Sequence, residues 1–209
     1  MNDSLDHNSR SADTIDCRSF RSGPDRRRFL PFSTVRCDGR PTFRTQLARD
    51  LGVLLDLDDE IAAWRCLPAA VEFHDSDGEI LSHAPDFLVL NEDGSTILMD
   101  AEGPIGIRPC DPTTAYRSIS TSEIRTEPAL TNAREMMRYA RRTVSLGDRV
   151  RLLAWLEEAG SVTLIEAASA MRESGEPVGA VLAMVLKRHV AIEWHEMPIG
   201  PETQVRLRR

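Results

Sequence analysis

The feature that most constrains the fold is a series of short strand-like segments interrupted by two Asp-Gly turns. The turns lie at Asp77-Gly78 and Asp93-Gly94, and the residues on both sides of each turn favour strands. Just before them, in residues 45–57, apolar side chains recur every three or four positions, which predicts an amphipathic helix. A helix followed by a meander of adjacent strands predicts an α/β domain and excludes an all-helical chain.

Five strands are expected in this part of the chain, at residues 70–73, 79–82, 87–90, 96–100 and 116–120. Residues 103–114 should form a loop, because they include two glycines and three prolines, which interrupt regular structure. A second helix is expected over residues 130–142, a stretch that carries several arginines.

The C-terminal part has a different pattern. Helices are expected over residues 149–159, 163–171 and 177–188, and two short strands over residues 190–195 and 204–207. Three helices followed by two strands are the order of a winged helix-turn-helix domain. We therefore expect a flexible basic arm at 1–30, an α/β domain at 31–145 and a small winged-helix domain at 146–209.

Charge is distributed unevenly along the sequence. Residues 1–50 contain 10 Arg against 7 acidic residues, whereas residues 51–110 contain 2 Arg against 13 acidic residues. A basic arm is compatible with a phosphate backbone, and an acidic middle segment is compatible with metal ligands. A solvated tail and an acidic surface would give the same pattern, so charge alone leaves both interpretations open.

The cysteines and the apolar segments indicate a cytoplasmic protein with no membrane partner. Cys17, Cys37, Cys66 and Cys110 form no Cys-x-x-Cys pair, so we expect reduced thiols rather than a zinc site or disulfides. No stretch approaches the roughly 18 apolar residues of a membrane-spanning helix. The first residues also lack the apolar core of a signal peptide.

Three carboxylates are candidates for a catalytic metal site. Asp100 and Glu102 alternate along one expected strand, and pairing with the preceding strand can bring Asp86 beside them. Such a group can bind Mg²⁺, which activates water for phosphodiester hydrolysis. The alternative is that all three are polar residues at strand ends. His83, close to Asp86 in sequence, either borders this site or is an ordinary loop histidine.

Two groups of arginines are candidates for contacts with DNA. The arm contains the run Arg26-Arg27-Arg28, and the helix expected at 130–142 carries four more arginines. At helical spacing these four can form a continuous positive face that binds phosphates. The alternative is an ordinary solvated face. The four residues are Arg134, Arg138, Arg141 and Arg142.

A larger set of residues carries a family resemblance. It includes Ala48-Arg49-Asp50-Leu51, residues 54–61, Trp64, Pro68 and Pro85-Asp86-Phe87. In this order the residues resemble the first part of the TnsA-type heteromeric transposase endonucleases. Residues 121–125 and 130–133 are similar to the segment that closes the nuclease domain of that family, which also carries a C-terminal winged helix. The resemblance covers about residues 30–207.

The resemblance implies a restriction-endonuclease-like core with a mixed sheet. In that family a helix Glu, a strand Asp and a Gln/Glu-x-Lys pair hold Mg²⁺ and cut DNA at one end of a transposon. It also implies two protein partners, a transposase subunit and an AAA+ ATPase.

This sequence departs from the family at the catalytic positions. Ala48 stands where the helix Glu is expected, Asp100 replaces the Gln/Glu, and Glu102 occupies the position of the Lys. Lys187 is the only lysine of the chain, so no other lysine can take over that role. An arginine such as Arg108 can supply positive charge but cannot act as a base.

Three functions therefore remain open. The chain is either an active Mg²⁺-dependent DNA endonuclease or a degenerate subunit of the same kind. The alternative from another class is a winged-helix transcription regulator or a non-catalytic DNA-binding or adaptor protein. The third helix of the winged-helix domain has no basic residue between positions 177 and 184. That composition favours a protein partner over reading of a DNA major groove.

Overall fold

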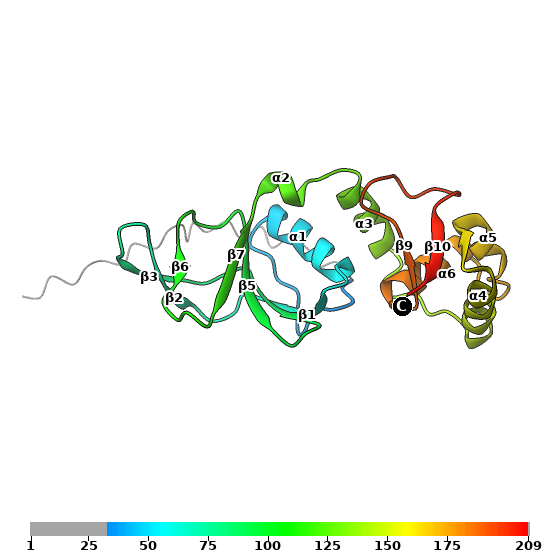
Figure 1. Cartoon of the computed structure of the whole chain (residues 1–209), viewed down its shortest axis with the longest axis horizontal. Helices are drawn as coiled ribbons and strands as arrows, with labels where there is room; N and C mark the ends of the chain where they lie inside the picture. Colours follow the sequence, from blue (N-terminus) through cyan, green and yellow to red (C-terminus); the bar gives the residue numbers. More distant parts are fainter. Residues whose placement is uncertain (1–32, 209) are drawn as a thin grey trace, which may run out of the picture.

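The computed structural model describes residues 33–208 and confirms the α/β class. The arm expected at residues 1–30, with Arg26, Arg27 and Arg28, lies outside the described residues. Figure 1 shows an elongated molecule with most strands at one end and the C-terminal helices at the other. Within residues 33–208 no helix is long and apolar enough to cross a membrane.

Helix α1 (Gln46–Leu57) agrees with the predicted amphipathic helix. The side chain of Thr45 caps its first turn by accepting a hydrogen bond from the Ala48 N–H at 2.9 Å. Leu47, Leu51 and Leu55 are buried on one face of the helix. The apolar spacing in the sequence therefore marks the face that packs on the sheet.

The central sheet contains four strands in the order β1-β4-β5-β7. Strand β1 (Ile61–Cys66) is antiparallel to β4 (Phe87–Asn91), and β4 is antiparallel to β5 (Thr96–Ala101). Strand β7 (Ala115–Ile119) runs parallel to β5. The sequence analysis missed β1. A shift in register between Ile61 and Ala63 breaks the alternation that marks a strand.

The expected single meander is wrong, because the two Asp-Gly turns close hairpins in different sheets. One hairpin joins β4 to β5 in the central sheet. The other joins β2 (Val71–His74) to β3 (Ile80–His83) in a second sheet of order β3-β2-β6. Strand β6 (Arg108–Pro109) lies within the expected loop. Pro85, which has no N–H to donate, lies in the break between the sheets.

The C-terminal part contains the predicted elements and one additional short strand. After α2 (Thr121–Ile124) and α3 (Ala129–Met137), the remaining elements are α4 (Leu146–Ala159), β8 (Ser161–Thr163), α5 (Leu164–Ser169), α6 (Pro177–Leu186), β9 (Val190–Ile192) and β10 (Gln204–Leu207). Strands β8, β10 and β9 form a small antiparallel sheet in that order. Helix α3 ends five residues before the predicted position, because residues 138–141 form turns.

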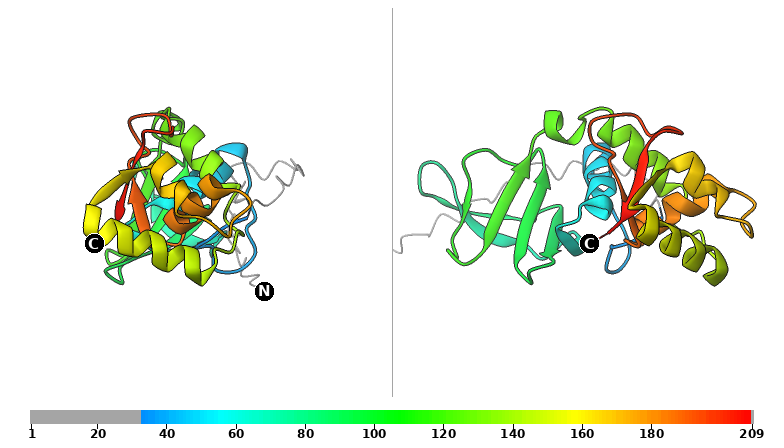
Figure 2. Two further views of the ribbon diagram at one scale, coloured as in Figure 1. Left: turned by 90° about the vertical axis from the view of Figure 1, so that its right-hand side faces the viewer. Right: turned by 45° about the vertical axis from the view of Figure 1, so that its right-hand side comes forward.

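Two apolar cores meet at α1, which lies between the central sheet and the C-terminal part in Figure 1 and in the right view of Figure 2. One core contains the sheet-facing side of α1 with Trp64 and Phe87. The other contains Val53 and Leu57 of α1 together with α3 and the C-terminal elements. Helix α3 therefore packs in the same core as residues 146–208, which follow it in sequence.

Candidate functional site

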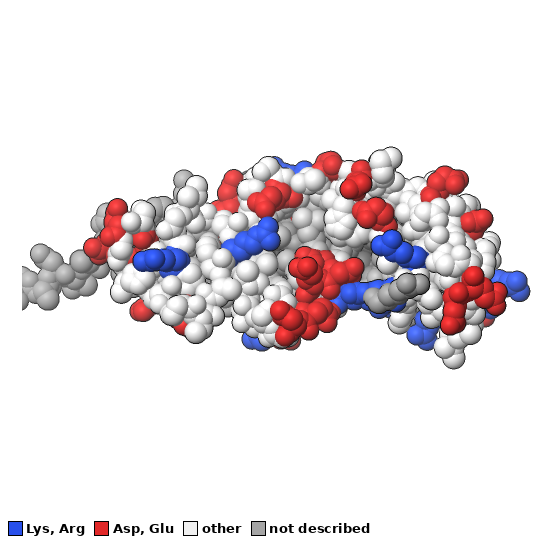
Figure 3. Space-filling view, viewed as in Figure 1, with Lys and Arg blue, Asp and Glu red and all other residues white. Residues whose placement is uncertain are grey.

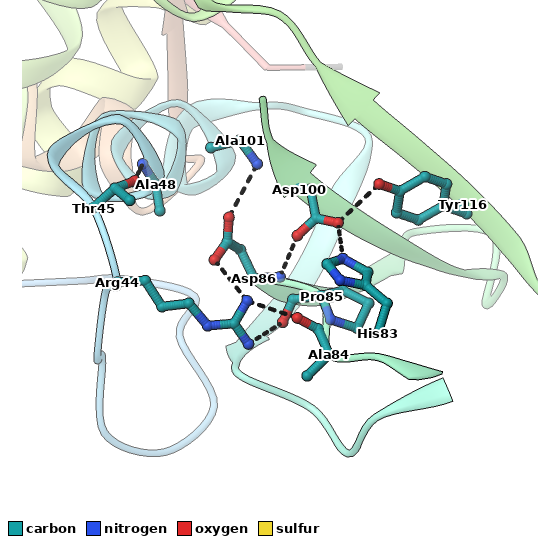
Figure 4. A network of polar contacts seen from close by, with 10 residues as sticks. All are labelled: Arg44, Thr45, Ala48, His83, Ala84, Pro85, Asp86, Asp100, Ala101 and Tyr116. Atoms are coloured by element: carbon teal, nitrogen blue, oxygen red, sulfur yellow. Dashed lines mark hydrogen bonds and ion pairs between the residues drawn. The ribbon is translucent and has the colours of Figure 1, made fainter. Parts of the chain in front are cut away.

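The site is centred on two carboxylates from adjacent strands of the central sheet. Asp86 directly precedes β4, and Asp100 lies in β5, which pairs with β4. The backbone N–H of Asp86 donates to Asp100 Oδ1 at 2.8 Å, and the N–H of Ala101 donates to Asp86 Oδ2 at 3.1 Å. Figure 4 shows both carboxylates in one network. These two residues are thus brought together as the strand pairing predicted.

Two further side chains hold Asp100. His83 Nε2 at the end of β3 and the Tyr116 hydroxyl of β7 lie 2.6 Å and 2.8 Å from Asp100 Oδ2. An ionised carboxylate can only accept hydrogen bonds, so the His83 proton is on Nε2. The rings of His83 and Tyr116 both pack edge-on against Phe73. Asp100 is therefore fixed from the second sheet as well as from its own.

Arg44 contributes a positive charge from the segment before α1. Its Nη1 atom lies 3.3 Å from Asp86 Oδ1 and donates to the carbonyl of Ala84 at 2.6 Å. Its Nη2 atom donates to the carbonyl of Pro85 at 3.3 Å. The guanidinium is therefore anchored beside Asp86 by the carbonyls of the two residues that precede it (Figure 4).

The two carboxyl groups have pKa values shifted in opposite directions. Burial raises the pKa of Asp86, and the nearby Asp100 adds to the shift, although the Ala101 N–H and Arg44 oppose it. Burial also acts to raise the pKa of Asp100, but the hydrogen bonds from His83 and Tyr116 outweigh it and lower the pKa. Burial and the Asp100 carboxylate raise the pKa of Tyr116, which keeps its hydroxyl as a donor.

Helix α1 supplies no carboxylate at the position where the family resemblance expects Glu. Ala48 is 1% exposed and belongs to the apolar core beneath the sheet. Figure 4 shows it on the side of α1 that faces Asp86. Asp50, two residues later, accepts hydrogen bonds from Gln46 at 2.7 Å and from Arg134 at 2.8 Å. Ala48 therefore has no oxygen to offer as a ligand, and Asp50 Oδ1 is engaged by Gln46 and Arg134.

Glu102 does not join the other two carboxylates. Strand β5 ends at Ala101, and Glu102 has a left-handed backbone with φ of 59°, so the alternation that predicted a shared face stops there. Its side chain is exposed and takes no part in the network of Figure 4. A Cβ on the next residue, Gly103, would lie 2.5 Å from both Asp100 Cβ and the Tyr116 hydroxyl. Only glycine allows the chain to pass so close to the site.

The donor set does not fit a Mg²⁺ ion in this arrangement. Every carboxylate oxygen of Asp86 and Asp100 already accepts a hydrogen bond or ion pair from the protein. Magnesium requires about six oxygen ligands in near-octahedral geometry. Among residues 33–208 no three His, Cys, Asp or Glu side chains are arranged to hold a metal ion. The magnesium site over Asp86, Asp100 and Glu102 remains a prediction from the sequence.

The continuous positive face expected on one helix is wrong, because α3 ends at Met137 and three of the four arginines lie beyond it. Three of the four are held by acidic partners. Arg134 pairs with Asp50, Arg138 with Glu135 and Arg142 with Glu176.

Arg141 alone of these four is exposed without an ion pair to any described residue. On the face in Figure 3, basic side chains form small separate patches among acidic ones. This face therefore offers isolated phosphate contacts rather than a continuous basic surface.

The sequence analysis gave no role to Arg44 and Tyr116, and left the role of His83 open. Arg44 comes from the segment before α1, Tyr116 from β7 and His83 from β3. These segments come close to the two carboxylates only in the folded protein. The single sequence signal was the closeness of His83 to Asp86.

Comparison with known proteins assigns no family and no function to the chain. No protein family model matches the chain, and no curated protein matches it. The resemblance to TnsA-type endonucleases consequently stays a prediction drawn from the residues themselves.

Proposed function

We propose that this protein is a TnsA-like subunit that acts on DNA at transposon ends with a transposase partner and an AAA+ ATPase, and that it does not itself cleave DNA. One observation carries the second half of the proposal. Each oxygen of the Asp86 and Asp100 carboxylates, which would hold Mg²⁺ in an active enzyme, already accepts a hydrogen bond or ion pair from the protein. These contacts support a structural role for the network.

The chemistry of the surrounding residues supports the same conclusion. Metal-dependent hydrolysis of a phosphodiester needs open ligand positions and a group that positions or deprotonates water. Ala48 has no polar side-chain atom, and Arg44 stays protonated and so cannot act as a base. Arg44 instead offsets the charge of Asp86, the role that a bound cation would otherwise have. The negative charge of Asp86 is therefore offset by Arg44 without a metal ion.

The burial of α6 argues against the transcription-regulator alternative. In a winged helix of that kind the third helix enters the DNA groove. Residues 179–184 of α6 are all buried, and a Cβ on Gly179 would lie 2.4 Å from the Tyr139 ring. Because these residues of α6 are buried, we infer that the helix packs within the protein rather than contacting DNA bases.

A cleavage assay tests the proposal directly. The full chain is incubated with labelled transposon-end DNA, with and without the transposase, in Mg²⁺ or Mn²⁺. We expect the protein to bind the DNA. We expect no strand cleavage above the background of a heat-inactivated sample. Metal-dependent cleavage that Asp86→Asn abolishes and Glu135→Gln preserves would overturn it, since Glu135 is exposed on α3, away from the Asp86 network.

A further inference from the structure

A small cavity lies where the N-terminal half of the chain meets the C-terminal part. Its volume is about 30 Å³, and its polar lining comes from four separate places in the sequence. These are Arg36 before α1, Asp56 and Asp59 near the end of α1, Arg188 after α6, and Arg208 after β10. Three arginines converging on one enclosed space are unusual, because like charges repel.

Each of the three arginines has one buried nitrogen with no hydrogen-bond partner among the described residues. These atoms are Arg36 Nε, Arg188 Nε and Arg208 Nη1. A buried donor without an acceptor is costly, because it has given up its hydrogen bond to water. Three such donors around a single cavity therefore indicate a missing acceptor inside it.

The other nitrogens hold the guanidinium groups in place. Arg188 Nη2 donates to the carbonyls of Asp58 at 2.7 Å and Ile61 at 2.6 Å, and its Nη1 atom pairs with Glu92. Arg36 Nη1 donates to the carbonyl of Leu186 at 3.4 Å. The guanidinium groups of Arg36 and Arg188 are thus held in place by bonds to the backbone and to Glu92.

The two aspartates of the cavity do not fill this need. Asp56 Oδ1 accepts from the Arg36 N–H at 2.9 Å and the Trp64 indole N–H at 2.8 Å, and its Oδ2 accepts from the Val35 N–H at 3.1 Å. The Asp59 side chain is 70% exposed. Its Oδ1 pairs with Arg208 Nη2 at 3.3 Å, but it lies 3.9 Å from Arg188 Nε, too far for a hydrogen bond, and it leaves Arg208 Nη1 without a partner among the described residues.

The electrostatics around Arg36 agree with an unfilled anion position. Burial lowers the pKa of Arg36, and the positive charges of Arg188 and Arg208 lower it further. Asp56 and Asp59 oppose these effects without cancelling them. An additional negative charge in the cavity would stabilise all three guanidinium groups.

We propose that this cavity binds a small anion, a halide or one oxygen of an oxyanion such as phosphate, which accepts hydrogen bonds from Arg36, Arg188 and Arg208. The cavity has room for a water-sized ligand. A water molecule has only two acceptor lone pairs, and its own two protons also need acceptors. An anion can accept hydrogen bonds from all three donors. A neighbouring hollow of about 640 Å³ shares Asp59, Ala191 and Arg208 with the cavity and gives room for the rest of an oxyanion.

The bound anion would join the two halves of the molecule. Arg36 and its neighbours lead into the central sheet, whereas Arg188 and Arg208 follow elements of the C-terminal part. This site is independent of the proposed function, because it uses neither the Asp86 network nor contact with DNA.

Chloride NMR of the full chain tests the site. We expect the protein to broaden the ³⁵Cl line, and we expect Arg208→Gln to reduce the excess broadening at least fivefold. Arg172→Gln, which changes an exposed arginine outside the cavity, should leave it unchanged. Arg36→Gln provides a second variant, since Arg36 belongs to a different part of the chain. Loss of the broadening on adding phosphate would place oxyanions in the same cavity, and its persistence would assign the site to halides.

Equal broadening by the wild-type protein and by folded Arg208→Gln and Arg36→Gln would overturn the proposal. Crystals grown in sodium bromide provide an independent measurement. An anomalous bromide peak between the three guanidinium groups is expected, and a water molecule at that position without anomalous signal would refute anion binding.

Discussion

Asp56 makes the stability of the fold depend on pH in a way that one substitution can isolate. Its carboxylate is buried beneath Trp64 at the end of α1, and burial raises its pKa from 3.8 to about 6. The hydrogen bonds from Arg36, Trp64 and Val35 oppose the shift without cancelling it. The folded chain therefore keeps this proton to a higher pH than the unfolded chain does.

The size and direction of the effect follow from linkage. A pKa of about 6 in the folded chain against 3.8 in the unfolded chain corresponds to about 3 kcal/mol at most. Between these two values the folded state binds more protons, so the free energy of unfolding falls as the pH rises. The contribution of Asp56 is fully present below about pH 4 and is lost above about pH 6.

Urea unfolding followed by tryptophan fluorescence measures this difference. Asp56→Asn cannot ionise, so the wild-type protein should lose about 2–3 kcal/mol relative to the variant between pH 4 and pH 7. Glu60→Gln, at an exposed carboxylate close in sequence, should follow the wild-type profile. Parallel profiles for the wild-type protein and Asp56→Asn would refute the assignment, whatever the absolute stability of the variant.

Two further outcomes are expected. Gly103→Ala should lower the free energy of unfolding by roughly 1–3 kcal/mol in urea titrations, because its Cβ meets Asp100 and Tyr116 at 2.5 Å; an unchanged midpoint would contradict this. In DNA-binding titrations, Arg141→Ala should reduce the slope of log affinity against log salt by about 1, because each phosphate contact contributes about that much. Arg138→Ala, which removes an arginine already paired with Glu135, should change it less, and equal slopes for both variants would contradict the expectation.

Much of the local structure could be predicted from the sequence. The apolar spacing in residues 45–57 located α1, and the Asp-Gly pairs located both hairpin turns. The order of the C-terminal elements was also correct. These features depend on residues close together in the chain, where periodicity and turn chemistry are informative. Strand β1 was missed because its bulge interrupts the alternation.

The candidate site was less predictable, since its geometry depends on the tertiary fold. Strand pairing correctly placed Asp86 beside Asp100. Alternation failed at Glu102, where the backbone turns into the left-handed region. Arg44 and Tyr116 come from segments that no local pattern connects to the carboxylates. The sequence therefore identified the acidic pair, and the fold determines that protein donors occupy it.

The position of α1 between two cores has a consequence for how such a chain can change over evolutionary time. Leu51 and Leu55 pack toward the sheet, whereas Val53 and Leu57 complete the core of the C-terminal part. A chain whose carboxylate site lost its role could not discard its N-terminal half without loss, because the C-terminal half would then lack part of its own interior. Selection on that shared helix would preserve the fold of the α/β half while the residues of its carboxylate site remained free to diverge.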